Sequence, residues 1–224
     1  MFTMCRFDEE YAYIFCGLEE ERDIKMNDEL ILVDSQDRVI GYGEKLEVHQ
    51  KELLHRAFSI FIFDRTDQTM LIQKRAAGKY HSGGLWTNAC CSHPRKGETM
   101  ETCLSERVKE ELGLKVQFHI VDPKTDGLFT EERNAIYSCG SFIYLARFDG
   151  LSEHEIDHVF LYCPLAHTFA KEDFVCNPEE IEDSRWVTMD ELDKWMAASP
   201  EEFTAWFGKA LELVRKRMGQ RKYV

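Results

Sequence analysis

Three features that mark common protein classes are missing from this sequence. No apolar run approaches the roughly 20 residues that a membrane-spanning helix needs, and the acidic N-terminus lacks the pattern of a secretory signal peptide. Basic residues are scarce, because 28 Lys and Arg face 41 Asp and Glu and leave a formal net charge of −13. We therefore expect a cytoplasmic protein that binds neither membranes nor nucleic acid. A small anionic substrate remains compatible, since a few clustered Arg and Lys can reverse the local field.

The eight cysteines form no C-x-x-C pair, the spacing that marks many zinc and redox sites. Disulfides are typical of secreted proteins, so we predict that most of these cysteines are small, buried, apolar residues. The sequence also lacks internal repeats, low-complexity segments and a recognisable linker. At 224 residues it is long enough to bury a real core. We expect a single domain over residues 27–224, preceded by an extension over residues 1–26.

The stretch from Ser92 to Leu114 carries the strongest local pattern. Thr99 is a good N-cap, and Gly113 can end a helix in the left-handed conformation. The sequence therefore predicts a helix that follows Thr99 and runs to Leu112. Its apolar side chains recur at four-residue steps and should face the core. They are Leu104, Val108 and Leu112.

Arg107, Glu110 and Glu111 lie three and four residues apart on a neighbouring, wetter face of this helix. Two carboxylates beside one guanidinium can grip a metal ion and a phosphate together. An ordinary solvated helix surface would explain the same residues if the segment stood alone. The choice between the two interpretations depends on the rest of the chain.

Aromatic and β-branched residues predict strands on both sides of this helix. The most apolar run, His55–Phe63, should be a central strand. The other expected elements are a hairpin over 29–34 and 39–48, strands over 69–74, 115–121, 137–148 and 153–163, a short strand ending near 186–187, and helices over 189–197 and 200–218. Mixed strands with helices on either side predict an α/β sandwich around a central sheet.

A basic loop that contains glycine follows the strand over 69–74. It carries Lys74, Arg75 and Lys79 ahead of Gly83 and Gly84. Cationic side chains on a flexible loop beside a strand suit capture of a diphosphate. A solubilising turn explains the same composition equally well, so the loop alone does not assign a function.

Side chains that commonly bind metals are dispersed along the chain. His49 and His55 flank the start of the central strand, and His93 comes shortly before the predicted helix. Glu153 and Glu155 are two residues apart on a strand, and alternation places them on the same face. We interpret the remaining histidines as ordinary core or surface residues; they are His81, His119, His154, His158 and His167.

Three motifs, in order, resemble one known family. The segments EKLEVHQKELLHRAFS, LWTNACCSHP and EHEID are similar to those of the type I isopentenyl-diphosphate isomerases, which have the Nudix fold. The stretch from Ser92 to Leu114 also has the 23-residue length of the box that defines the Nudix family, with Glu98, Glu110 and Glu111 in register. The resemblance runs from about Asp28 to Trp206. It implies a Nudix-like α/β/α sandwich with a mixed central sheet.

The sequence departs from these patterns at three places. Ser92 replaces the opening glycine of the box. Glu106-Arg107 reverses its usual Arg-Glu, so a cation stands where the hydrolases have a metal-binding carboxylate, and this disfavours diphosphate hydrolysis. In the isomerase pattern Ser82-Gly83-Gly84 replaces an aromatic-Pro-Gly, which suggests a more mobile loop.

The resemblance implies two metal sites. Three histidines and two glutamates would hold one ion, and they fall on His49, His55, His93, Glu153 and Glu155. Such a set of nitrogen and oxygen donors suits Zn²⁺, Mn²⁺ or Mg²⁺. A second ion, Mg²⁺, would bind the substrate diphosphate together with Glu111.

The activity implied is interconversion of isopentenyl diphosphate and dimethylallyl diphosphate, by protonation at the terminal alkene carbon and deprotonation at C2. The family's proton-transfer residues fall on Cys91 and Glu155, assisted by Tyr144. We expect metal-bound Glu155 to deliver one proton and Cys91 to remove the other. Trp206 matches a tryptophan whose π face can stabilise a cation. The matching cations for the diphosphate are Lys45, Arg75, Lys79 and Arg107.

Two other functions fit parts of the pattern. A Nudix hydrolase of a nucleoside or prenyl diphosphate is favoured by Glu110-Glu111 and disfavoured by Arg107. A non-catalytic binding protein with the Nudix fold is disfavoured because Cys91, Glu155 and all five metal positions are present. Cys91 and Trp206 also have plain structural interpretations, as packed core residues.

Overall fold

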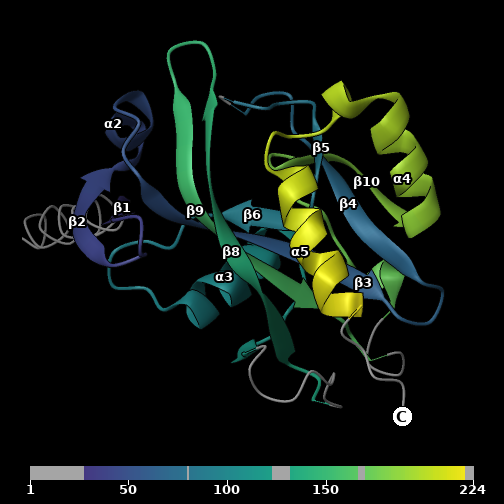
Figure 1. The fold of residues 1–224 in the computed structure, drawn as a ribbon. Helices are drawn as coiled ribbons and strands as arrows, with labels where there is room; N and C mark the ends of the chain where they lie inside the picture. Colours follow the sequence, from purple (N-terminus) through teal and green to yellow (C-terminus); the bar gives the residue numbers. More distant parts are fainter. Residues whose placement is uncertain (1–27, 80, 123–131, 166–169, 220–224) are drawn as a thin grey trace, which may run out of the picture.

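The computed structural model describes residues 28–219 except for 80, 123–131 and 166–169, and it shows one mixed sheet with helices on both faces (Figure 1). The predicted extension over residues 1–26 lies outside the described residues. The strands are β1 (Glu29–Val33), β2 (Val39–Glu44), β3 (His55–Asp64), β4 (Thr69–Arg75), β5 (Trp86–Thr87), β6 (Cys90–Ser92), β7 (His119–Val121), β8 (Ala135–Arg147), β9 (Ser152–Tyr162) and β10 (Ile181–Thr188). The helices are α2 (Lys45–Gln50), α3 (Met100–Leu112), α4 (Met189–Ala198) and α5 (Phe207–Gly219), with 3-10 turns η2 (Lys171–Asp173) and η3 (Pro200–Glu202). None of the helices in the described ranges is long and apolar enough to cross a membrane.

Strands β3 and β9 form the centre of the sheet. They run parallel, and their register sets His55 opposite Glu155. The main path of the sheet is β10-β4-β3-β9-β8-β7, with β1 and β6 also paired to β3. β8 and β9 form a long antiparallel hairpin in which Tyr144 is opposite Glu155. The predicted central strand and the mixed sheet are confirmed.

Alternation along β3 builds a core on each face of the sheet. Phe61 packs with Phe207 of α5, and their ring centroids are 5.8 Å apart. Ile60 faces the other way and packs with Leu104 and Val108 of α3. Full burial of one side chain of this size stabilises the fold by about 1.5–3 kcal/mol. With α5 and α3 on opposite faces (Figure 1), the protein is the α/β/α sandwich that the sequence predicts.

Helix α3 begins and ends as predicted. The hydroxyl of Thr99 accepts a hydrogen bond from the backbone N–H of Thr102 at 3.2 Å, and Gly113 is left-handed with φ of 70°. The prediction that Glu111 lies on a wetter face is wrong, because Glu111 is only 3% exposed. Glu111 follows Leu104 by seven residues, two helical turns, and therefore shares the buried side of the helix.

The predicted strand over 39–48 ends early. β2 stops at Glu44, whose carboxylate accepts hydrogen bonds from the backbone N–H groups of Leu46 at 3.1 Å and Glu47 at 3.0 Å. This side chain satisfies the first donors of a helix, as an N-cap does, and α2 begins at the next residue. The change matters for the site, because α2 carries Lys45 and His49.

Two other predicted ranges are also wrong. Only residues 119–121 of the expected strand over 115–121 pair with β8. The expected helix over 200–218 is interrupted between η3 and α5. There the backbone N–H of Thr204 donates to the carbonyl of Trp86 at 3.0 Å, and the Thr204 hydroxyl lies 3.0 Å from that of Thr87. These bonds to β5 hold the segment out of the helix and place Trp206 beside the sheet.

Candidate active site

The structure brings most of the predicted site residues together around one pocket, at the end of the sheet where β3, β6 and β9 meet α2 and α3. The predicted residues that line it are Lys45, Arg75, Lys79, Cys91, His93, Arg107, Glu111, Tyr144, Glu153, Glu155 and Trp206. His49 and His55 lie behind them, next to His93. Lining residues that the sequence did not single out include Gln73, His81, Asp157 and Glu180.

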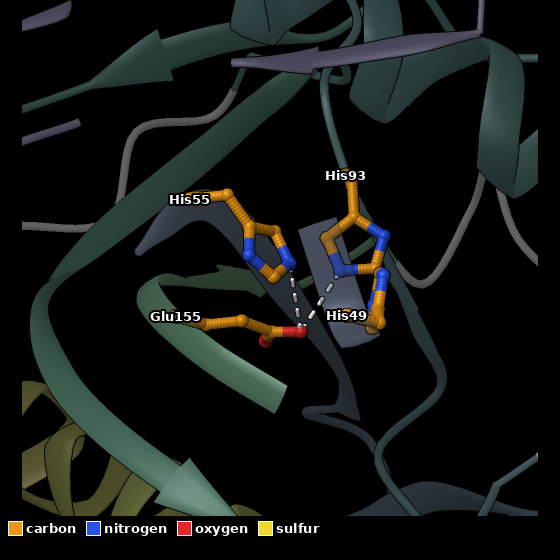
Figure 2. A group of neighbouring side chains, drawn as sticks. All are labelled: His49, His55, His93 and Glu155. Carbon is orange, nitrogen blue, oxygen red and sulfur yellow. Dashed lines mark hydrogen bonds and ion pairs between the residues drawn. The ribbon is translucent and has the colours of Figure 1, made fainter. Parts of the chain in front are cut away.

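Four of the five predicted metal ligands form a tight cluster (Figure 2). One donor atom from each of His49, His55, His93 and Glu155 lies within 4.8 Å of all the others. Nε2 of His93 is 2.8 Å from Oε1 of Glu155, and Nε2 of His55 is 3.6 Å from the same oxygen. The parallel register of β3 and β9 makes His55 and Glu155 neighbours. The hydroxyl of Ser152 on β9 donates to the carbonyl of His49 at 2.9 Å and ties α2 to the cluster.

Backbone carbonyls set the tautomers of two of these histidines. Nδ1 of His49 is 2.6 Å from the carbonyl of Lys45, and Nδ1 of His55 is 2.9 Å from the carbonyl of Leu53. Because a carbonyl can only accept, each Nδ1 carries the proton and each Nε2 keeps its lone pair. Nε2 of His55 is buried and has no hydrogen-bond partner. Such an oriented, unused lone pair is what a metal ligand requires.

Burial favours the neutral form of two imidazoles of the cluster. It lowers the pKa of His49, and it lowers the pKa of His93 to about 3. Burial opposes ionisation of Glu155, but the His93 and His55 rings beside it hold its pKa well below the ordinary value. Three imidazole nitrogens with one carboxylate form a donor set that fits a divalent ion such as Zn²⁺ or Mn²⁺, and also Mg²⁺.

Glu153, the fifth predicted ligand, lies beside the cluster and not within it. The hydroxyl of Tyr144 donates to Oε2 of Glu155 at 2.7 Å and approaches Oε2 of Glu153 at 3.3 Å. Burial and the neighbouring charge of Glu155 raise the pKa of Glu153 well above its ordinary value. The two carboxylates therefore differ in charge state, although strand alternation places both on the same face.

Cys91 and Cys90 point to opposite sides of β6. Cys90 is fully buried in the core beneath α3, whereas Cys91 lines the pocket. Nη1 of Arg75 donates to the sulfur of Cys91 at 3.5 Å. Burial raises the pKa of Cys91 to about 12, and the nearby Arg75 only partly opposes that effect. The thiol is therefore protonated at neutral pH.

Cations gather on the other side of the pocket, and two of them have acidic partners. Nη2 of Arg107 donates to Oε1 of Glu111 at 2.9 Å, and Lys79 pairs with Glu180. Burial lowers the pKa of Lys45 and raises the pKa of Glu111. Lys45, Arg75, Lys79 and Arg107 thus line one pocket in a protein whose net charge is −13, and such a cluster of cations suits a small anionic ligand.

Trp206 is buried against the same pocket. Its indole N–H donates to Oδ1 of Asn88 at 3.1 Å, which fixes the ring. Its ring centroid is 6.2 Å from that of Tyr144, and the guanidinium of Arg75 lies 5.6 Å from the ring. A π face held in this way can stabilise a cation in the pocket by about 2 kcal/mol.

Sequence reasoning missed two residues of the pocket. Asp157 is 2% exposed and accepts a hydrogen bond from the hydroxyl of Ser59 at 2.8 Å. The same alternation that paired Glu153 and Glu155 could have added it. His81, interpreted from the sequence as an ordinary core or surface residue, is buried, and its Nδ1 lies 3.1 Å from Oε1 of Glu153. No local pattern signals this contact, since it depends on how the loop after β4 folds.

Comparison with known proteins identifies similar sequences. A family model described as the NUDIX domain matches residues 53–207, more than half of the chain. The Isopentenyl-diphosphate Delta-isomerase 2 of Aromatoleum aromaticum is 41% identical over 192 residues, which cover 84% of this chain and 87% of that protein. The Isopentenyl-diphosphate Delta-isomerase of Photobacterium profundum is 40% identical, with 84% and 95% of the two chains covered.

Solved structures share the fold at lower sequence identity. A protein from Deinococcus radiodurans matches with a TM-score of 0.56 at 19% identity, covering 84% of this chain and 98% of that one. The MutT protein from Methanosarcina mazei matches with a TM-score of 0.51 at 15% identity, covering 75% and 96%. At these identities the likeness bears on the fold alone, and it agrees with the sandwich described above.

Proposed function

This chain belongs to the NUDIX family and to its isopentenyl-diphosphate Delta-isomerases, and on that premise we propose that the pocket around Cys91 and Glu155 is where it moves the double bond. One observation carries the proposal. A protonated thiol, an ionised carboxylate bound by a tyrosine, a histidine cluster and several cations all meet at a single pocket.

The reaction places strict demands on such a pocket. Conversion of isopentenyl diphosphate to dimethylallyl diphosphate adds a proton to the terminal alkene carbon and removes one from C2. An unactivated alkene is a very weak base, so a positioned acid and a positioned base must act from the protein. The tertiary carbocation that develops between the two steps must also be kept from water.

Cys91 and Glu155 are the residues proposed to exchange these protons. Each turnover needs one of the two protonated and the other ionised, and the raised pKa of Cys91, about 12, with the lowered pKa of Glu155 supplies that arrangement. The directions favour Cys91 as the first donor and Glu155 as the first base, the reverse of the roles expected from the sequence. The pair ends a turnover with its protonation states exchanged, and return of the proton to Cys91 resets the site. Tyr144 steadies the carboxylate of Glu155 throughout.

The histidine cluster is proposed to hold one divalent ion. His49, His55, His93 and Glu155 would be its ligands, and Glu153 lies beside them, joined to Glu155 through Tyr144. A cation bound there supplies a fixed positive charge that orients Glu155 and favours its ionised form. The unused lone pair of His55 supports this assignment.

The cations across the pocket are proposed to hold the diphosphate. Lys45, Arg75, Lys79 and Arg107 all line it, and the fork of an arginine matches phosphate oxygens. Glu111 would hold a Mg²⁺ that neutralises part of the diphosphate charge. The hydrolase alternative is weaker, because Arg107 occupies the position where the hydrolase pattern has a carboxylate and Glu110 is exposed.

The remaining requirement is shelter for the carbocation. Trp206 and Tyr144 present aromatic rings to the pocket, and an aromatic face attracts a cation without reacting with it. Trp206 is 2% exposed, so its side of the pocket is closed to solvent.

One incubation tests the proposed function. The protein is supplied with isopentenyl diphosphate and Mg²⁺ in heavy water, and the products are followed by proton NMR. The isomerase predicts dimethylallyl diphosphate that carries deuterium. Release of inorganic phosphate without that product would establish hydrolysis instead, and an unchanged substrate would establish that the pocket only binds.

A further inference from the structure

The loop between β4 and β5 is folded tightly beside the pocket. Its ends are joined by hydrogen bonds from the N–H of Arg75 to the carbonyl of Leu85 at 2.9 Å and from the N–H of Gly84 to the carbonyl of Arg75 at 3.0 Å. Within it the N–H of Lys79 donates to the carbonyl of Ala76 at 3.1 Å. The loop therefore has a defined conformation, although the sequence alone suggests mobility.

Two glycines make this conformation possible. Gly84 has φ of 77°, where residues with side chains are strained. A Cβ on Gly83 would come within 2.8 Å of the carbonyl oxygen of Ala77, closer than real side chains approach. Only glycine at position 83 allows the chain to pass this close to the start of its own loop. His81, in the same loop, lines the pocket.

His81 is packed between the two sides of the site. Nδ1 lies 3.1 Å from Oε1 of Glu153. One face of the ring stacks near Phe148, with centroids 5.3 Å apart and planes at 23°, and His49 stacks at 6.1 Å with the same angle. His81 is 8% exposed. Such packing leaves the ring little freedom to rotate, so its contact with Glu153 is fixed.

We propose that His81 is a positioning residue that orients the carboxylate of Glu153 and ties the basic loop to the histidine cluster. Glu153 is then held at both oxygens, by Tyr144 at Oε2 and by His81 at Oε1. Glu155 is contacted by Tyr144 at Oε2 and by His93 at Oε1, in both cases through a hydrogen bond. His81 thus contacts the carboxylate of Glu153, and His93 contacts that of Glu155.

The inference rests on the proposed function, because it assigns a partner to a carboxylate proposed to help hold the metal. Groups that orient metal-binding carboxylates act through the ligand, and their loss typically lowers metal affinity about 10–100-fold.

Two substitutions separate the polar contact with Glu153 from the stacking. His81→Asn keeps a polar group near the place of Nδ1 and removes the ring, whereas His81→Phe keeps a ring for stacking and removes the polar group. Binding of Mn²⁺ alone to the metal-free protein is measured for both by the loss of the free-ion EPR signal. His154→Ala is the matched control, because His154 follows Glu153 directly but turns away to the carbonyl of Glu52, 2.9 Å from its Nδ1.

We expect His81→Phe to bind Mn²⁺ about tenfold more weakly and His81→Asn to stay within about threefold of the unsubstituted protein. His154→Ala should bind as the unsubstituted protein does. Unchanged affinity in His81→Phe, with a large loss in His49→Ala, would overturn the role of His81 and leave the metal site standing. Equal weakening in His81→Phe and His81→Asn would also overturn it, since the polar group at position 81 would then be irrelevant. Unchanged affinity in His49→Ala would remove the metal site itself.

Discussion

The two walls of the pocket are built by different means. One wall is a single strand, β9, which presents Glu153, Glu155 and Asp157 at alternate positions. The other wall gathers its cations from separate elements: Lys45 from α2, Arg75 from the end of β4, Lys79 from the following loop and Arg107 from α3. The first wall is fixed by a hydrogen-bonded ladder on both sides, and the second depends on how distant segments pack.

The walls also differ in how they manage charge. On the strand wall three carboxylates crowd together, and burial with mutual repulsion raises the pKa of Glu153 and of Asp157 while Glu155 stays ionised. On the cation wall Arg107 and Lys79 already have carboxylate partners, Glu111 and Glu180. The strand wall is thus suited to holding and moving protons. The cation wall is suited to binding an anionic ligand in place of the carboxylates of Glu111 and Glu180.

The largest expected effect comes from the thiol that stands between the two walls. Cys91→Ala should lower kcat about 10²–10⁴-fold, the range for loss of one positioned acid or base. Mn²⁺ affinity should not change, because Cys91 lies outside the histidine cluster. Both are measured on one preparation, with Cys176→Ala as a control thiol outside the pocket. Full activity in Cys91→Ala would remove this residue from the mechanism.

A change on the cation wall should affect substrate binding and leave the metal cluster intact. Arg107→Gln removes a charge-assisted contact worth about 1.5–3 kcal/mol, so KM for isopentenyl diphosphate should rise about 10–100-fold with a smaller change in kcat. Lys109→Gln makes the same change of charge at an exposed position of the same helix and should leave KM as it was. A similar rise in both variants would mean that the net charge of the protein, and not the wall, sets KM.

A smaller effect is expected from the third carboxylate of the strand wall. Burial and the charge of Glu155 raise the pKa of Asp157 to about 8. The folded protein therefore binds this proton more tightly than the unfolded chain does, and stability is lost as pH rises towards that pKa. Asp157→Asn keeps the shape and removes the titration. Between about pH 5 and about pH 8, the free energy of unfolding of metal-free protein should fall less in the variant, and identical pH dependence would contradict the assignment.

The smallest effect should come from outside both walls. Thr99 caps the helix that carries Arg107 and Glu111, and removal of an N-cap typically costs about 1 kcal/mol. Thr99→Ala should lower the free energy of unfolding in urea by about that amount and leave kcat and KM unchanged, while Thr99→Ser should be neutral. A large change in KM would show that the position of Arg107 in the cation wall depends on the cap at Thr99, contrary to this expectation.

The contrast between the walls also explains what could be predicted from the sequence. Alternation along β9 and β3 is a local property, so Glu153, Glu155 and the central strand were found directly. The cap at Thr99 and the end at Gly113 are local too. Burial of Glu111, in contrast, depends on which side of α3 meets the sheet, and α2 depends on the carboxylate of Glu44. Both depend on tertiary or side-chain contacts, and the spacing of residues along the chain does not specify these.

The cation wall shows this limit most clearly. Local patterns point to Arg75, Lys79 and Arg107 only as one of two interpretations, the family resemblance adds Lys45, and the roles of all four stay a prediction. For His81 the sequence favours an ordinary core or surface residue, because a lone histidine carries no spacing that marks a site. Its contact with Glu153 joins a loop to a strand more than 70 residues further along the chain. In loops that need glycine for a close approach of the backbone, the sequence alone does not predict which side chains come into contact.

The central claim is that a metal-held carboxylate and a thiol share one pocket, and the location of the metal tests it most directly. Crystals grown with Mn²⁺ would be measured for anomalous scattering. The account predicts an anomalous peak bounded by Nε2 of His49, Nε2 of His55, His93 and Glu155, with the sulfur of Cys91 turned to the same cavity. A map without a peak among these four residues, or with Cys91 facing the core beside Cys90, would contradict it.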